Sequence, residues 1–360
     1  MTEQRQFVRY LFLRAAPEWR RRPVAQRAAD TEELAETVLR FRARLLLRTY
    51  SLVGTRADAD LLFWQVAEDL ETLQRFETAV RATGLGGYLE PVRSFLSMTR
   101  KSDYAFPPGA NGDRALAVSP ADAAYLFVYP FVKRREWYRL SPEARQEMMT
   151  EHVRVGREFP GVRINTTYSF GLDDQEFVVA FEGDDPGEFL DLVMALRSTA
   201  ASAYTERDTP MYTCLQMSVR EALDVLGGRP VVRRVPDARA DGFVRVAAID
   251  EIPDRGGRRC YLGAEAIALF RVGDRVYAVG DRCPHGRASL SEGRIDVTRE
   301  EVVCPWHDGR FDLSTGHRVS GPPRSAVGVY TVRVEGPDVW VRACPVPDRP
   351  VGAAEREVLA

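Results

Sequence analysis

Apolar and polar positions in the N-terminal part of the chain follow the same order twice. In each copy a glycine and acidic residues precede an apolar run of strand type, and further acidic residues then open an amphipathic helix. The first copy comprises Gly54, Asp58 and Asp60, the run Leu61–Trp64, and a helix from Glu68 to about Thr83. The second comprises Gly171, Asp173 and Asp174, the run Phe177–Phe181, and a helix from Asp184 to about Thr199. A strand, a helix and a strand precede each turn, and a closing strand follows each amphipathic helix. The pattern therefore predicts the order β-α-β-β-α-β twice, a pair of ferredoxin-like units.

A second, different pattern begins near residue 242. Glycine, proline and polar residues interrupt the apolar periodicity between about 225 and 241, and short β runs separated by Gly and Asp turns follow. The expected runs are Ala264–Val272, Val276–Val279, Val329–Val334 and Val339–Val341. We therefore expect an α+β domain at 1–225, a linker at 226–241, an all-β domain at 242–346 and a C-terminal tail at 347–360.

Composition narrows the function classes. The 360 residues carry a formal net charge of -2, so no basic field favours nucleic acid as a partner. The strongest apolar run, near Ala123–Val132, is far shorter than the roughly 20 residues that span a bilayer, and no signal peptide is visible. The spacing of Cys214, Cys260 and Cys344 suggests no disulfide framework. We expect a cytoplasmic protein without a membrane partner.

Two cysteines and two histidines in the β-rich part stand at metal-ligand spacing. Cys283 and His285 form a C-x-H pair, Cys304 and His307 form a C-x-x-H pair, and 18 residues separate the pairs. A four-coordinate zinc site uses the same ligand types, so spacing alone leaves zinc open.

The flanking residues favour an iron-sulfur cluster. The stretches CPHGRASLSEG and VVCPWHDGRFDLSTG, with the proline-containing loop Ser320–Pro323, resemble the loops of Rieske 2Fe-2S ferredoxins. The resemblance implies that Cys283 and Cys304 hold one iron while His285 and His307 hold the other, which raises the reduction potential of the cluster. The additional cysteine pair of respiratory Rieske proteins is missing, so the resemblance is to the disulfide-free electron-transfer type.

The second ferredoxin-like unit carries a further resemblance. The segments Tyr129–Tyr138 (YPFVKRREWY), Met148–His152 (MMTEH) and Ser169–Phe177 (SFGLDDQEF) resemble the haem protein family of chlorite dismutases and coproheme decarboxylases. The similarity covers roughly residues 5–220 and is strongest in this second unit. It implies a dimeric α+β barrel that binds haem b or coproheme and assembles as a homo-oligomer, usually a pentamer.

His152 is the candidate haem ligand. On a helix from about Pro142 to Glu158 it shares an apolar face with Met148, Met149 and Val155, where a lone histidine is ordinarily a hydrogen-bonded core residue. The family resemblance instead implies a proximal iron ligand at this position. A carboxylate often accepts the other ring N–H of such a histidine, and Glu206 is the candidate by rough alignment.

Three other residues match pocket positions of the family. The resemblance implies a radical-forming catalytic role for Tyr129, an assisting role for Lys133 and a place in the haem pocket for Trp137. Read without the family, Tyr129 can also be a packed aromatic residue with its hydroxyl at the surface.

The opposite side of the pocket departs from the family. Ile164 stands where chlorite dismutases have an arginine and one decarboxylase branch has a glutamine, and no second histidine precedes the linker. Chlorite conversion is therefore disfavoured, and peroxide activation lacks an obvious proton shuttle.

Three functions remain. The first is a haem-dependent oxidoreductase that acts on a small substrate, with the Rieske domain as an electron donor within the same chain. The second is an atypical coproheme decarboxylase, in which the porphyrin is the substrate, and the third is a non-catalytic haem sensor or electron carrier. No G-x-G-x-x-G fingerprint is present, so an external reductase is an expected partner.

Overall fold

The structure is a computed structural model that describes residues 5–42, 44–105, 117–118, 120–121, 123–229, 241–254, 256–262 and 265–342. The chain divides into two compact units, Met1–Val231 and Val232–Ala360. Cys344, the expected tail and most of the expected linker lie outside the described residues.

The first unit contains the predicted repeat. The first copy comprises β1 (Phe7–Ala15), α2 (Val24–Phe41), β2 (Leu46–Ser51), β3 (Leu61–Ala67), α3 (Leu70–Arg81) and β4 (Leu89–Met98). The second comprises β5 (Tyr125–Lys133), α5 (Pro142–Gly156), β6 (Arg163–Tyr168), β7 (Phe177–Gly183), α6 (Pro186–Arg197) and β9 (Tyr212–Met217). Three shorter elements lie within these repeats, α1 (Pro17–Arg20), α4 (Arg135–Arg139) and β8 (Thr205–Arg207), and α7 (Val219–Leu226) follows the second.

Local chemistry explains where these elements begin. Gly54 and Gly171 open the central turns of the two copies with φ of 87° and 73°, a left-handed conformation that glycine adopts without strain. The side chains of Asp69 and Asp185 accept backbone N–H groups at the start of α3 and α6, and Ser141 does the same for α5. α5 ends at Gly156, two residues earlier than the sequence pattern predicts.

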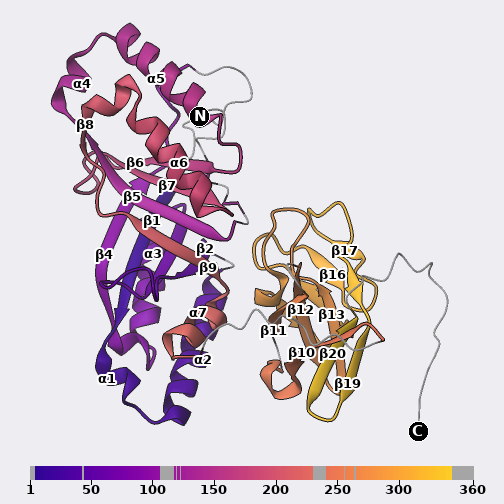
Figure 1. Ribbon diagram of the computed structural model, residues 1–360. Coiled ribbons are helices and arrows are strands. Elements are labelled where there is room, and N and C mark those ends of the chain that lie inside the picture. Colours follow the sequence, from indigo (N-terminus) through magenta and orange to yellow (C-terminus); the bar gives the residue numbers. More distant parts are fainter. Residues whose placement is uncertain are drawn as a thin grey trace. The chain divides into compact units, whose positions relative to one another are not determined.

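The eight long strands close into a barrel. The order is β7-β6-β4-β1-β3-β2-β9-β5, with β5 also paired to β7, and β8 continues from β5. The seam between the copies consists of three residue pairs at β2–β9 and of a single pair, Met98 and Tyr168, at β4–β6. Side chains of both copies fill the barrel interior, and the helices of the two copies cover opposite ends of the unit (Figure 1). The predicted α+β barrel is confirmed.

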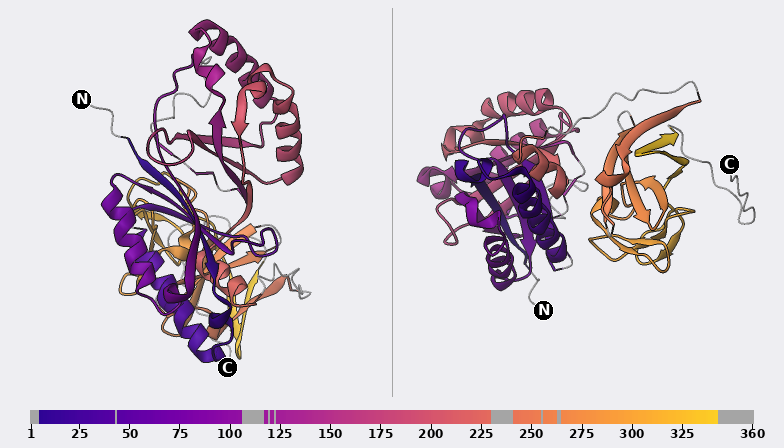
Figure 2. Two further views of the ribbon diagram at one scale, coloured as in Figure 1. Left: turned by 90° about the vertical axis from the view of Figure 1, so that its left-hand side faces the viewer. Right: turned by 90° about the horizontal axis from the view of Figure 1, so that it is seen from below.

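The second unit is built from short antiparallel strands, as its orange-to-yellow ribbon shows in Figure 2. One sheet has the order β10 (Phe243–Ala248), β20 (Asp338–Arg342), β19 (Val332–Glu335). A second has the order β11 (Gly257–Leu262), β12 (Glu265–Val272), β13 (Arg275–Gly280), β18 (Val329–Tyr330). The third has the order β14 (Arg294–Asp296), β15 (Glu301–Val303), β16 (Arg310–Asp312), β17 (Arg318–Ser320). The all-β expectation is confirmed, although the run expected at 329–334 is divided between β18 and β19.

Within the described ranges, no helix is both long and apolar enough to cross a membrane.

Candidate functional site

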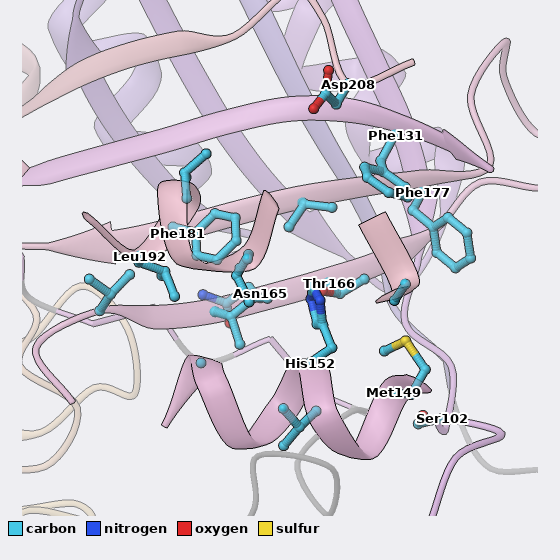
Figure 3. A pocket seen from close by; sticks show the side chains of 18 of the residues that line it. Ser102, Phe131, Met149, His152, Asn165, Thr166, Phe177, Phe181, Leu192 and Asp208 are labelled. Carbon is cyan, nitrogen blue, oxygen red and sulfur yellow. The ribbon is translucent and has the colours of Figure 1, made fainter. Parts of the chain in front are cut away.

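The second repeat of the first unit is hollow where the first repeat is packed. In the first repeat α2 buries six side chains, and leucine and aromatic residues fill the space between helices and sheet. In the second repeat α5, described over its whole length, buries no side chain. A cavity of about 580 Å³ lies between α5, α6 and the sheet (Figure 3). Its volume is that of a site for a substantial ligand, and its lining is mainly apolar and aromatic.

The sheet side of the pocket follows from strand alternation. The lining residues of β6 pair with lining residues of β7: Ile164 with Phe181, Thr166 with Val179, and Tyr168 with Phe177. On the other side of β7, Tyr129 and Phe131 of β5 pair with Val179 and Phe177. One face of three adjacent strands therefore forms the wall opposite the helices.

His152 points from α5 into this pocket, towards β6 (Figure 3). Its Nδ1 lies 3.4 Å from the hydroxyl oxygen of Thr199, which donates its own proton to the carbonyl of Leu196. The Thr199 oxygen can then only accept from His152, so this contact favours a proton on Nδ1 and a lone pair on Nε2. Burial, followed by the charge of Lys133, lowers the pKa of His152 to about 4, so the ring is neutral near pH 7. A neutral imidazole with a free ring nitrogen is the state that binds a metal.

The expected partner of His152 requires a correction. Glu206 is exposed on β8 and is not among the residues that line the pocket. The group beside Nδ1 is Thr199, 47 residues away in sequence. A hydroxyl at that position belongs to no recognisable sequence motif, so the sequence could not predict it.

Lys133, Trp137 and Tyr129 lie together in the lining of the pocket. The Lys133 ammonium donates to the carbonyl of Ala201 at 2.8 Å and lies 4.3 Å from the centroid of the Trp137 ring. Burial lowers the pKa of Lys133 to about 8. Of the 50 lysine and arginine residues only Lys101 and Lys133 are lysine, so the pocket holds a cation that can lose its proton where arginine cannot.

The structure also brings an ion pair to the pocket that the sequence did not indicate. Arg197, at the end of α6, pairs with Asp208, and both line the cavity with Tyr129. Burial and then the negative charge of Asp208 raise the pKa of the Tyr129 phenol. The phenol therefore stays protonated in the physiological range.

The four predicted cluster ligands of the second unit come together at the ends of two loops. The Nδ1 atoms of His285 and His307 lie 3.2 Å apart, with both rings exposed. Cys283 and Cys304 are buried, and a hydrogen bond from the Cys304 thiol, with backbone N–H groups of His285 and Gly286, lowers the pKa of Cys283 to about 6. Within the part of the chain that the structure describes, no three metal-binding side chains converge on one ion position. The ligands approach as a cysteine pair and a histidine pair, the sets that hold the two irons of a Rieske cluster.

Neighbouring residues hold the two ligand loops in place. Asp281, fully buried, accepts from Arg259, from the Ser289 hydroxyl and from the backbone N–H of Ser291, and so closes the loop that bears Cys283 and His285. In the second loop Gly309 has no room for a side chain, because the ring of the buried Pro323 lies against it. The predicted proline loop therefore packs against the loop that bears Cys304 and His307.

Comparison with known proteins agrees with both sites. The chlorite dismutase family model matches residues 27–217, more than half of the chain. The chain belongs to the chlorite dismutase family. A Rieske [2Fe-2S] domain matches residues 242–331, so this member of the family carries a second cofactor domain. Both resemblances predicted from the sequence are confirmed, as are the predicted cofactors, a haem and a 2Fe-2S cluster.

Individual relatives match one unit or the other. A coproheme decarboxylase of Mycolicibacterium smegmatis is 34% identical over 175 residues, which are 48% of this chain and 74% of the relative. The ferredoxin CarAc of Metapseudomonas resinovorans is 42% identical over 95 residues, 26% of this chain and 87% of the relative.

Two solved structures resemble the first unit. A chlorite dismutase from Candidatus Nitrospira defluvii in complex with imidazole has 25% identity and a TM-score of 0.57, and the match covers 62% of this chain and 95% of that one. A haem-binding protein from Thermus thermophilus has 26% identity, a TM-score of 0.56 and the same coverage.

The ligand pairing predicts the effect of removing one cysteine. Cys304→Ser is expected to abolish the cluster, because a hydroxyl is a poor ligand for iron-sulfur chemistry, whereas Cys260→Ser, at a buried cysteine of β11, is expected to retain it. Iron and sulfide analysis with electron paramagnetic resonance of the reduced protein measures the loss. Stoichiometric zinc without sulfide in the wild-type protein would contradict the assignment.

The lowered pKa of Lys133 can be measured directly because the chain has one other lysine. After reductive methylation with ¹³C-formaldehyde, the Lys133 methyl signal is expected to titrate near pH 8, charged below and neutral above. Lys133→Arg identifies the signal by removing it. A Lys133 midpoint near the ordinary lysine value of about 10.4 would show that the pocket does not desolvate Lys133.

Proposed function

We propose that this chain is a haem-dependent oxidoreductase that acts on a small-molecule substrate and receives electrons from its own Rieske domain. The observation that carries the proposal is the presence, in one chain, of an apolar pocket with a neutral histidine and of a cluster ligand set with exposed histidines. The haem-binding protein of Thermus thermophilus and the ferredoxin relatives support the two halves of this assignment.

The residues of the pocket fit a haem. The helices and sheet leave an apolar space that no side chain fills, and His152 offers a free ring nitrogen from α5. His152 would hold the iron, and Trp137 and Ile164 would contact the porphyrin. When bound, haem supplies one-electron and oxygen chemistry.

Polar side chains of the pocket would supply protons and hydrogen atoms to a substrate bound there. Tyr129 keeps its phenolic proton because burial and Asp208 oppose ionisation, so its O–H is a hydrogen source for a substrate in the pocket. Lys133 Nζ can give or take a proton near pH 8, and the Trp137 ring holds it in position. Ile164 adds no polar group to the wall of β6, so it neither donates nor accepts a proton.

The second unit fits the role of electron donor. Cys283 and Cys304 would hold the buried iron and His285 and His307 the outer one, whose exposed imidazoles offer a short route for electrons. A covalent tether raises the effective concentration of the donor without requiring tight binding. An external reductase must reduce the cluster again after each transfer.

We also propose a cytoplasmic homo-oligomer, by family resemblance a pentamer. The four cysteines in the described residues are all free, as expected in a reducing compartment.

One observation favours a second candidate, an atypical coproheme decarboxylase. Tyr129 and Lys133 line the same pocket, and the relative from Mycolicibacterium smegmatis is named for that activity. In this case the porphyrin would be the substrate. The apolar Ile164 and the attached Rieske domain favour the first candidate.

Following the porphyrin by mass spectrometry separates the two functions. The protein, reconstituted with iron and sulfide, is loaded with iron coproporphyrin III and given peroxide, or oxygen with a reductant. We expect the porphyrin mass to remain unchanged. Stepwise loss of two carboxyl groups, abolished in Tyr129→Phe, would make the porphyrin the substrate and overturn the proposal.

A further inference from the structure

One hydroxyl on the β6 wall of the pocket has no role in the fold. β6 presents Ile164, Thr166 and Tyr168 on the face that lines the cavity. Ile164 is apolar and 37% exposed, and the Tyr168 hydroxyl is hydrogen-bonded to Ser102. Thr166 is exposed, and among the described residues its hydroxyl has no hydrogen-bond partner. It is therefore free to bind a ligand.

The residues on either side of Thr166 both make hydrogen bonds that stabilise the barrel. Thr167 faces the barrel interior, is 1% exposed, lies 2.8 Å from the Ser97 hydroxyl and donates to the carbonyl of Val178. Asn165 donates its side-chain amide to buried Glu182 at 2.9 Å. Both neighbours use their polar groups to hold the barrel together, although Asn165 also borders the cavity. Thr166 is different because it lines the cavity and makes no side-chain hydrogen bond to the described residues.

Thr166 lies across the pocket from His152. In Figure 3 the imidazole points from α5 towards the part of β6 that carries Thr166. A ligand held between the two elements would thus have the histidine on one side and the threonine hydroxyl on the other. The other uncommitted hydroxyls of the described lining, those of Tyr129 and Thr205, belong to β5 and β8.

A threonine hydroxyl can form the hydrogen bonds that the apolar side chain of Ile164 cannot. It donates one hydrogen bond and accepts others, so it can hold a small anion or a polar diatomic molecule without carrying charge itself. We propose that Thr166 Oγ1 is the group that hydrogen-bonds a small anionic or diatomic ligand in the pocket, across from His152. This inference rests on the proposed haem function, because it requires His152 to hold the haem on the opposite side.

Fluoride is a suitable probe, since it is small, anionic and dependent on a hydrogen-bond donor. The ferric haem-loaded full-length chain is titrated with fluoride and followed by its visible spectrum. Thr166→Val, which removes the hydroxyl at nearly constant shape, is expected to weaken fluoride binding about tenfold, the effect of losing one hydrogen bond to an anion. Thr166→Ser should restore the affinity to within about twofold, since the donor returns. The carbon monoxide stretching frequency of the ferrous form should shift in Thr166→Val and return in Thr166→Ser.

Thr205→Val is the matched control, because it removes another free hydroxyl of the same pocket. Unchanged fluoride affinity in Thr166→Val, or an equal loss in Thr205→Val, would overturn the inference. His152→Ala separates this failure from that of the proposed function. If the haem spectrum of His152→Ala differs from that of the wild-type protein, His152 ligates the iron. If the two spectra are the same, both the proposed function and this inference are overturned.

Discussion

The arrangement of this protein depends on the space left open beneath α5 and α6. A sheet and the helices that cover it normally close on a packed core, yet α5 buries no side chain. The helix is held at its edges instead: Gln146 exchanges two hydrogen bonds with the backbone of Ala105, and Glu151 accepts from the backbone N–H of Ala200. A bound haem would supply the missing core, so its binding and the docking of α5 are linked.

Comparison of the two internal repeats shows what the open space replaces. Both repeats have the same order of elements, and in each a second helix follows the third strand. In α3 the inward positions Leu73, Phe76 and Val80 are packed against the helices of the first repeat, whereas in α6 Leu192 is buried and Leu196 lines the cavity. The first repeat therefore supplies stability to the barrel, and the second gives up part of its packing for a ligand. The loss is local because the shared barrel interior is filled by both repeats.

Predictions from the sequence are most specific where a pattern is local. The repeat followed from hydrophobic periodicity and turn glycines, and the four cluster residues followed from two short motifs with conspicuous flanks. His152 required the family resemblance, since a lone histidine on an apolar helix face is ordinarily a core residue. The contacts around the pocket could not be predicted, because Asp208 and Thr166 in the lining, and Thr199 beside the histidine, come from separate parts of the chain without characteristic spacing. The choice of Glu206 shows this limit, since a carboxylate near the right place in sequence lies outside the pocket in space.

The central claim is that one chain holds both an electron donor and the haem that receives its electrons. It is tested most directly by reducing the cluster in the haem-loaded full-length protein with a limiting pulse of reductant and following the haem band by rapid-mixing spectroscopy. We predict first-order haem reduction at a rate independent of protein concentration, absent from Cys304→Ser. A haem that stays ferric while the cluster is reduced, or a rate proportional to protein concentration, would contradict this account.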